Sequence, residues 1–232
     1  LIDSEPVYAK NQIKCLNHFG IKVTEEDLIP LAGGTKIHYD QVLNPLLQGI
    51  VEREKYDHYL NDYYKKHPVD YKAILNPGVH ELLQYLKNKD YRIIVASSSA
   101  RWEIENVFNL CNLNGYFEFI MSGDMFKASK PNPEIYLKSV ENLGLTSDEC
   151  IAIEDSEYGI TAAKRAGLTC IGLEDLRYRY DQSQADYLIK KLIDIKDILE
   201  AVKQRYRVDG NAEITIECNP GTINSEKAYI YR

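Results

Sequence analysis

Three kinds of polar side chain follow three short apolar segments of this chain. A run of three serines, residues 97–99, comes directly after the segment YRIIVA. Lys130 lies in the stretch SKPNP, and Glu154 and Asp155 follow the segment CIAI. Hydroxyls, a fixed cation and neighbouring carboxylates are the groups that phosphoryl transfer uses, because that chemistry depends mainly on positioning and charge neutralisation.

The serines offer the elements of an anion site. Ser97, Ser98 and Ser99 bring hydroxyls and free backbone N–H groups to the start of a predicted helix, and helix starts bind phosphate. The alternative is that they only cap the next helix. Lys130, held before a proline-rich helix start, could neutralise a phosphate, although most lysines are simply solvated at the surface.

The two acids suggest a metal site. Glu154 and Asp155 end a segment that we expect to be buried, and buried carboxylates are costly unless a cation meets them. Mg²⁺ prefers hard oxygen ligands and few protein carboxylates, which suits this pair. Capping of the next helix is the alternative here too. Because serine, lysine and acids follow successive strands, we interpret them jointly as one phosphoryl-transfer site.

The elements that would position these residues alternate between strand and helix. Apolar runs predict strands at residues 91–96, 117–121, 150–153 and 168–173, and helical patterns fall at 77–86, 101–110, 133–143 and 157–166. This rhythm predicts an α/β fold, a Rossmann-like parallel sheet with helices on both faces. In such sheets ligands bind at the carboxyl ends of the strands, where the candidate residues lie.

The flanking regions have different patterns. Residues 5–76 are periodic and polar, with a loop at Gly33 and Gly34, and predict an all-helical insert. The end of the chain has a helix-like piece at 197–206 and a strand-like piece at 212–217, AEITIE.

Composition excludes several classes of function. The chain has 232 residues, a net charge of −7 and a pI near 5.3, which argues against nonspecific nucleic-acid binding. There is no apolar run long enough for a transmembrane helix and no signal-peptide pattern, so we expect no membrane association. Five scattered cysteines without CxxC spacing predict reduced thiols in a cytoplasmic protein.

The motifs together resemble the haloacid dehalogenase-like family, in its β-phosphoglucomutase-like and phosphatase branch. LIDSEP at the start resembles the end of that family's first motif, DxDGxLxDSE. The strand ending at Ser97 resembles the second motif, SKPNPEIY the third, and IEDSEYGITAAKRAG the fourth. NPGVHELLQYLK resembles the family's re-entry into the core after its cap domain.

The resemblance implies a core of residues 1–4 and 77–195, an all-helical cap of residues 5–76, and an extension of uncertain origin at 196–232. It also implies Mg²⁺ and an aspartyl-phosphate intermediate. Ser97 would bind the transferring phosphoryl group with help from the Ser98 N–H, and Lys130 would bridge that group and the nucleophile. Asp155 would hold Mg²⁺, with Glu154 nearby or coordinating.

The same resemblance suggests substrate contacts in the cap loop, where Thr35 and Lys36 follow the two glycines. Lys36 is a candidate partner for a distal anionic group of the substrate, and Ser99 and Arg101 are further candidates. A solvated surface position is an equal alternative for Lys36 and Arg101.

Two departures from the family pattern bear on activity. The nucleophilic aspartate of the first motif would fall before Leu1, so we expect the 232-residue chain to be inactive and its sheet to be weakened. Tyr8 stands where the mutases of the family carry a hinge histidine, which favours a phosphatase over a sugar-phosphate mutase. A non-catalytic phospho-ligand binding protein is the third alternative. We expect a monomer acting on a small phosphorylated metabolite, a sugar phosphate above all.

The stretch AEITIECNPGT near the end does not resemble that family. It resembles a short part of the radical S-adenosylmethionine enzymes related to oxygen-independent coproporphyrinogen oxidase. The CxxxCxxC cluster motif of those enzymes is absent from this sequence, so we expect no radical chemistry. A fused fragment and an added hairpin packed on the core are the two interpretations.

Overall fold

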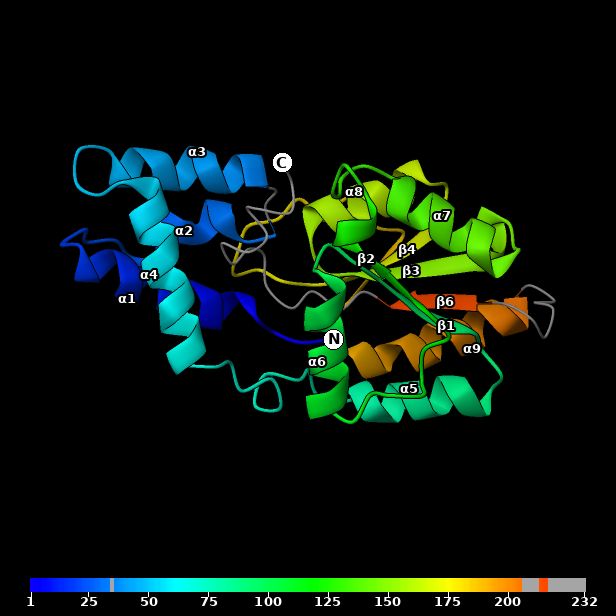
Figure 1. Ribbon diagram of the computed structural model, residues 1–232. Coiled ribbons are helices and arrows are strands. Elements are labelled where there is room, and N and C mark those ends of the chain that lie inside the picture. The colour runs from blue at the N-terminus through cyan, green and yellow to red at the C-terminus, as the bar shows by residue number, and fades with distance from the viewer. Residues whose placement is uncertain (34–35, 206–212, 217–232) are drawn as a thin grey trace.

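A computed structural model describes residues 1–33, 36–205 and 213–216, with side chains described for residues 1–33 and 38–200. Its centre is a sheet of six parallel strands in the order β2-β1-β6-β3-β4-β5 (Figure 1). Every neighbouring pair of strands is parallel. The strands are β1 (Ile93–Ser97), β2 (Ile120–Ser122), β3 (Cys150–Glu154), β4 (Thr169–Leu173), β5 (Tyr187–Ile189) and β6 (Glu213–Ile216). The predicted α/β fold class is therefore confirmed.

Helices cover both faces of this sheet. One face carries α5 (Val79–Asn88), α6 (Arg101–Leu110) and α9 (Ile195–Arg205), and the other carries α7 (Glu134–Leu143) and α8 (Glu157–Arg165). Alternate residues of one strand serve the two faces: Ile93 and Val95 belong to the first hydrophobic cluster, Ile94 and Ala96 to the second. Side chains buried on both faces explain why these strands read as continuous apolar runs.

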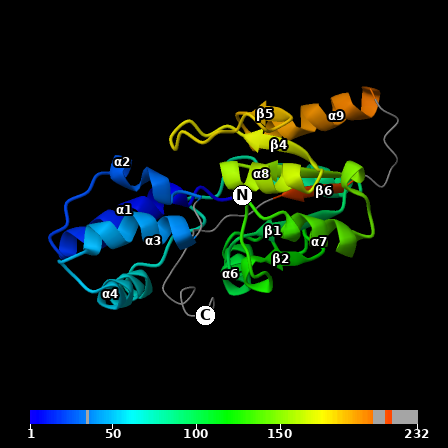
Figure 2. The same cartoon turned by 90° about the horizontal axis from the view of Figure 1, so that it is seen from above.

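The four helices nearest the start of the chain form a separate group beside the sheet, as both views show (Figure 2). They are α1 (Glu5–His18), α2 (Glu25–Leu28), α3 (Lys36–Leu47) and α4 (Arg53–Lys66). They pack on a hydrophobic cluster of their own, which includes Leu16, Leu43, Tyr56 and Leu60. The predicted helical character of this region is seen in the described residues, and the exact domain boundaries remain a prediction.

Two chain segments join the helical group to the sheet. Ile2 and Leu75 form an isolated antiparallel bridge, so the entry and exit of the helical insert lie side by side. Short 3₁₀ helices complete the described part of the fold: Ile29–Leu31, Gly123–Met125, Ser147–Glu149 and Leu192–Asp194.

Most predicted elements are found within a few residues of their expected bounds. The helix at Arg101–Leu110 has the predicted limits. In the predicted helical insert, α3 and α4 are separate helices, and Gly49 adopts a φ of 75° in the connection between them. Strand β5 was not predicted, since its three residues are too short to give a pattern.

The end of the chain differs most from expectation. Residues 196–200 belong to α9, whose Ile195 and Leu199 are buried in the core, and residues 213–216 form the strand between β1 and β3. The segment is therefore no added hairpin, since it pairs in parallel with both neighbours. The sheet thus has a strand between β1 and β3, and the expected weakening of the sheet stays a prediction.

None of the helices in the described ranges combines the length and the apolar character that a bilayer-spanning segment needs.

Candidate functional site

Lys130 lies at the centre of the candidate site, at the edge formed by the carboxyl ends of β1 and β3. Its Nζ is 2.7 Å from Glu154 Oε1 and donates a hydrogen bond of 3.0 Å to the carbonyl oxygen of Ala96. The side chains of Lys130 and Glu154 are 4% and 0% exposed. A lysine this deeply buried needs a carboxylate partner to stay charged, so the pair forms a fixed ionic group inside the protein.

The Glu154 carboxylate is held from several sides. Oε1 also accepts a hydrogen bond from the hydroxyl of Tyr136, which itself lies 3.3 Å from Lys130 Nζ. Oε2 has no hydrogen-bond partner among the described residues. It packs against Gly159 of α8, where a Cβ atom would overlap the carboxylate. The orientation of Glu154 thus depends on a glycine in the next helix.

The three serines form a tight turn after β1. Ser97 is fully buried, and its Oγ accepts a 3.1 Å hydrogen bond from the Ser99 N–H. The carbonyl group of Ser98 lies against Gly123, where a Cβ would overlap it, and the Gly123 N–H donates to the Ser99 carbonyl at 2.8 Å. Because Lys130 contacts the carbonyl of Ala96, the residue before Ser97, the structure brings the serine turn, Lys130 and Glu154 together.

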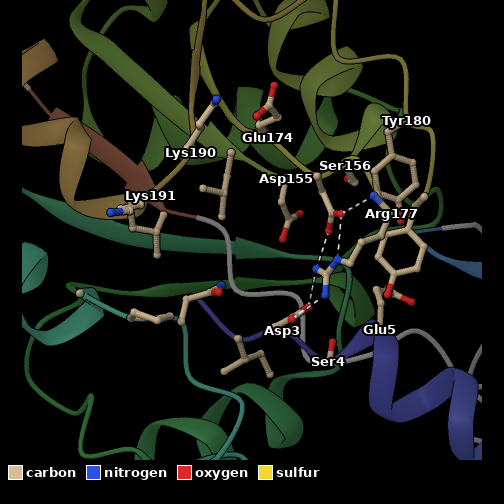
Figure 3. A pocket seen from close by; sticks show the side chains of 18 of the residues that line it. Asp3, Ser4, Glu5, Asp155, Ser156, Glu174, Arg177, Tyr180, Lys190 and Lys191 are labelled. Atoms are coloured by element: carbon tan, nitrogen blue, oxygen red, sulfur yellow. Dashed lines mark hydrogen bonds and ion pairs between the residues drawn. The ribbon is translucent and has the colours of Figure 1, made fainter.

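Asp155 faces in a different direction, toward a cavity of about 450 Å³. Figure 3 shows this cavity with Asp3, Ser4 and Glu5 on one side and Asp155 and Ser156 on the other. The further charged and aromatic residues that line it are Glu81 of α5 and, from the chain after β4 and β5, Glu174, Asp175, Arg177, Tyr178, Tyr180, Lys190 and Lys191. Ser97, Lys130 and Glu154 do not line this cavity. Asp155, the residue after Glu154, is therefore the point at which the cavity comes next to the buried Lys130–Glu154 pair.

Arg177 ties the beginning of the chain to the loop after β4. Its two terminal nitrogens donate to both carboxylate oxygens of Asp3 at 2.8 Å, and Nη2 also lies 2.6 Å from Asp175 Oδ2 (Figure 3). Sequence reasoning missed this group. Its signal was available, because Glu174 and Asp175 directly follow the predicted strand 168–173, at the same kind of strand end as the other candidates.

Glu5 is the carboxyl group with the most altered acidity in the cavity. Burial raises its pKa from 4.5 to about 7, although a hydrogen bond from the Gly33 N–H, 3.2 Å long, opposes the shift. The neighbouring carboxylates Asp155, Asp3 and Asp175 raise the pKa further. The cavity wall therefore carries an excess of acidic groups that a cation would relieve.

The donor set fits Mg²⁺ at Asp155 better than at Glu154. Mg²⁺ typically binds through one or two carboxylates, with water and substrate phosphate completing its shell. Asp155 opens to the cavity, whereas Glu154 is engaged by Lys130 and Tyr136 and faces α8. The described residues contain no preassembled group of three possible metal ligands among His, Cys, Asp and Glu. A cation here would therefore rely on Asp155 together with ligands that a substrate brings.

The remaining sequence-based candidates are less well placed or not described. Thr35 lies outside the described residues, and Lys36 begins α3 with a side chain that is likewise not described. Arg101 is exposed and its Nε donates to Glu105 at 2.8 Å, along its own helix. Tyr8, the residue at the hinge position, has its hydroxyl 3.5 Å from that of Tyr71. Cys218 is outside the described range, and the other four cysteines are buried thiols.

Direct contacts connect the helical group with the sheet-bearing part. The Tyr158 hydroxyl of α8 lies 2.9 Å from His38 Nε2 of α3, and Arg179 Nη2 donates to Glu26 Oε1 of α2 at 2.9 Å. The cavity is lined from both parts, since Glu5 and Gly33 belong to the helical group and Asp155 and Arg177 to the sheet-bearing part.

Comparison with known proteins accounts for this arrangement. Residues 1–173 match the family model of haloacid dehalogenase-like hydrolases. The chain is 30% identical over 169 residues to a phosphoglycolate phosphatase of Aquifex aeolicus, covering 72% of this chain and 76% of that protein. It is 28% identical over 170 residues to a phosphorylated carbohydrates phosphatase of Thermotoga maritima, covering 72% and 77%.

The fold is also found among solved structures. A crystal structure of a Thermotoga maritima protein assigned as a β-phosphoglucomutase has a TM-score of 0.68 to this chain at 27% identity, covering 87% of this chain and 94% of that one. The family match spans most of the chain, and this fold agrees with it. The chain therefore belongs to the haloacid dehalogenase-like hydrolases.

Proposed function

We propose that this protein is related in function to Mg²⁺-dependent phosphatases that hydrolyse small phosphorylated carbohydrates, with an aspartyl-phosphate as the intermediate. The observation that carries the proposal is the buried Lys130–Glu154 pair, whose lysine contacts the carbonyl preceding Ser97. Similarity to a phosphorylated carbohydrates phosphatase and to a phosphoglycolate phosphatase supports the phosphatase class.

In this proposal Ser97 and Lys130 bind the transferring phosphoryl group. The hydroxyl of Ser97 and the N–H of Ser98 donate to its oxygens, and the charge of Lys130 offsets the negative charge that these oxygens carry. Glu154 acts through Lys130: its carboxylate, fixed by Tyr136 and by the space that Gly159 leaves, holds the ammonium group in place.

Asp155 is the residue that we propose for Mg²⁺. When bound, the metal would neutralise charge on the phosphoryl oxygens and orient the group. The side chain of Asp155 lines the cavity, and burial together with neighbouring acids raises the pKa of Glu5 to about 7, so this carboxyl group is only partly ionised near neutral pH. Glu154 remains a candidate for a supporting position near the metal, not for direct coordination.

The residues that would contact the non-reacting part of the substrate remain predictions. Thr35 and Lys36 in the cap loop, with Ser99 and Arg101, are the candidates for contacts to a distal group. Ser99 is 1% exposed and Arg101 is paired with Glu105, so the cap loop is the stronger of the two regions. A cytoplasmic, monomeric protein also stays a prediction.

A sugar-phosphate mutase is the second candidate. The likeness to the Thermotoga maritima protein assigned as a β-phosphoglucomutase favours it. Tyr8 at the hinge position argues against it, because burial raises the pKa of this phenol well above its usual value of 10. Such a group would stay protonated at neutral pH and could not serve as the base that a histidine provides.

The test is an assay of a panel of phosphorylated metabolites with and without Mg²⁺. Two versions of the protein are compared: the 232-residue chain and a version that carries the family's first motif, DxDG, joined ahead of Leu1. We expect Mg²⁺-dependent phosphate release from the second version and none from the first. Isomerised sugar phosphate would favour the mutase instead, and saturable ligand binding without turnover in both versions would favour the binding protein.

A further inference from the structure

The side-chain amide of Gln182 makes three hydrogen bonds in the interior of the protein. Gln182 lies between β4 and β5 and is 8% exposed. Its Nε2 donates to the Leu173 carbonyl at 2.8 Å and to the Asp155 carbonyl at 3.0 Å, and its Oε1 accepts from the Asp175 N–H at 3.1 Å. Both N–H donors and the oxygen of the amide are therefore used, and the chemistry of the three partners fixes its orientation.

These hydrogen bonds join the ends of two neighbouring strands. Leu173 is the last residue of β4, and Asp155 directly follows β3. The two strands pair through their backbones up to Glu154 and Gly172. Beyond that pair the Gln182 amide continues the link, because it bridges the carbonyl groups of Leu173 and Asp155. The two strand ends are thus held together past the last residues of the ladder.

The bond to the Asp155 carbonyl fixes the peptide group that follows the proposed metal-binding residue. This peptide lies in the turn between β3 and α8, where the Ser156 side chain caps the helix by accepting from the Gly159 N–H at 3.1 Å. With its carbonyl held by Gln182 and the helix cap directly after it, the main chain at Asp155 has little freedom to rotate. The direction of the Asp155 carboxylate toward the cavity therefore depends on this bond.

The same amide closes the base of a loop that reaches the helical group. Residues 175–182, which we call the β4 loop, begin and end at the hydrogen bond between the first of these residues and the last. Within the loop, Tyr180 packs on Gly33 of the helical group, where an added Cβ would lie 3.2 Å from the tyrosine hydroxyl. Figure 3 shows Tyr180 and Arg177 of this loop along the cavity wall. Loosening the base of the loop would therefore also loosen this wall.

We infer that Gln182 is a positioning residue of the proposed phosphatase site. It holds the main chain of Asp155 and the base of the β4 loop as one unit, so the metal-binding carboxylate and the cavity wall keep a fixed relation to each other. The inference rests on the proposed function, because it takes Asp155 as the Mg²⁺ ligand. Gln182 itself contacts neither the metal nor the phosphoryl group and acts through Asp155.

The test compares Gln182→Met with Gln184→Met in the 232-residue chain. Methionine has nearly the length of glutamine but cannot replace its amide hydrogen bonds. Gln184 is the matched control, since it is exposed and its amide makes a long hydrogen bond of 3.4 Å to the Thr161 hydroxyl. Calorimetric titration with inorganic phosphate in the presence of Mg²⁺ measures the affinity of the folded proteins. We expect a loss of at least about tenfold in Gln182→Met and of less than about twofold in Gln184→Met.

The affinity of the folded protein separates positioning from a purely structural role. A residue that only stabilised the fold would change the unfolding temperature and leave the phosphate affinity unchanged. Equal phosphate affinities of wild type and Gln182→Met would therefore overturn the inference and leave the proposed site intact. Absence of Mg²⁺-dependent phosphate binding by wild type would instead reject the metal site at Asp155, and the role of Gln182 with it.

A second variant applies if Gln182→Met does not fold. Gln182→Asn keeps the amide group but is shorter by one methylene, so it cannot reach all three partners at once. We expect hydrogen exchange at the Asp175 amide to be at least about fivefold faster in Gln182→Asn than in wild type, together with a loss of phosphate affinity. An Asp175 amide as protected as in wild type, or an unchanged phosphate affinity, would contradict the inference.

Discussion

Lys130 Nζ and Glu154 Oε1 lie 2.7 Å apart in a part of the protein where neither side chain is more than 4% exposed. The two residues come from different connections of the sheet, Lys130 from the loop before α7 and Glu154 from the end of β3. Their contact draws together the carboxyl ends of β1 and β3, since the lysine also donates to the Ala96 carbonyl. This contact is the strongest evidence that the edge of the sheet at the carboxyl ends of β1 and β3 holds charged groups in fixed positions.

Replacing Lys130 should lower the free energy of unfolding by more than the Lys130–Glu154 pair itself contributes to it. In Lys130→Met the Glu154 carboxylate stays buried without its cation, and we expect the free energy of unfolding to fall by about 3–5 kcal/mol. The double variant Lys130→Met, Glu154→Gln should recover part of this loss, because the uncompensated charge is gone. Urea unfolding of Lys130→Met, of Glu154→Gln and of the double variant measures the coupling free energy between the two residues. A Lys130→Met change below about 1 kcal/mol would mean that the pair is not buried in solution.

Gly159 should tolerate no larger residue while Glu154 is present. A Cβ at this position would overlap the Glu154 carboxylate, so Gly159→Ala should destabilise the protein by about 1–3 kcal/mol despite the better helix propensity of alanine. Thr161→Ala, in the same helix, is the control. The cost of Gly159→Ala should shrink in a Glu154→Ala background. Thermal unfolding measures all four variants, and an unchanged cost in that background would point to a different contact.

Glu5 should make stability depend on pH. Its pKa is 4.5 in an ordinary setting and about 7 in the folded protein, where burial raises it. Below about pH 4.5 the carboxyl group is protonated in both states. Between about 4.5 and 7 the unfolded chain loses this proton first, so the folded state binds more protons and the free energy of unfolding falls as pH rises. Above about 7 this dependence ends.

The matched variant for this effect is Glu5→Gln. It keeps a side-chain oxygen that can accept from the Gly33 N–H, but it does not titrate. The difference in unfolding free energy between wild type and Glu5→Gln should therefore grow by a few kcal/mol between pH 4.5 and 7, in favour of the variant. Denaturant unfolding at several pH values measures it. Parallel pH profiles for the two proteins would show that Glu5 is ionised in the folded state.

The Arg177 contacts should matter much less for stability than the Lys130 pair. The Arg177 side chain is 51% exposed and that of Asp3 is 38% exposed. Exposed ion pairs contribute little, so Arg177→Gln should change the free energy of unfolding by less than about 1 kcal/mol. Chemical denaturation of Arg177→Gln and of Lys130→Met under the same conditions measures the two losses of unfolding free energy. A loss from Arg177→Gln as large as that from Lys130→Met would mean that the loop after β4 is part of the folding core.

Sequence periodicity predicted the sheet and its helices well because the apolar strands face helices on both sides. The run IIVA has no alternation, and in the structure its residues are divided between two hydrophobic clusters. The convergence of the serine turn, Lys130 and Glu154 also followed from the rule on strand ends. The different directions of Glu154 and Asp155 did not, because adjacent residues in sequence give no sign of which one faces Gly159.

The position of the last strand was beyond sequence reasoning. The segment AEITIE gave a strand pattern, but strand order in a sheet depends on contacts between residues far apart in the chain. Ile214 pairs with Ile93, and no local pattern connects them. The Arg177 group was missed for a related reason: Asp3 and Arg177 are distant in sequence, and only the fold makes them neighbours.

The most direct test of the account is calorimetric binding of inorganic phosphate in the presence of Mg²⁺, comparing wild type with Asp155→Asn. Binding does not require a nucleophile, and Asp155 is partly exposed at the cavity, so the variant should keep the wild-type fold by circular dichroism. We predict saturable phosphate binding by wild type that requires Mg²⁺, and at least a tenfold loss of affinity in Asp155→Asn. Equal, Mg²⁺-independent binding by both proteins, or none by either, would contradict the proposed site.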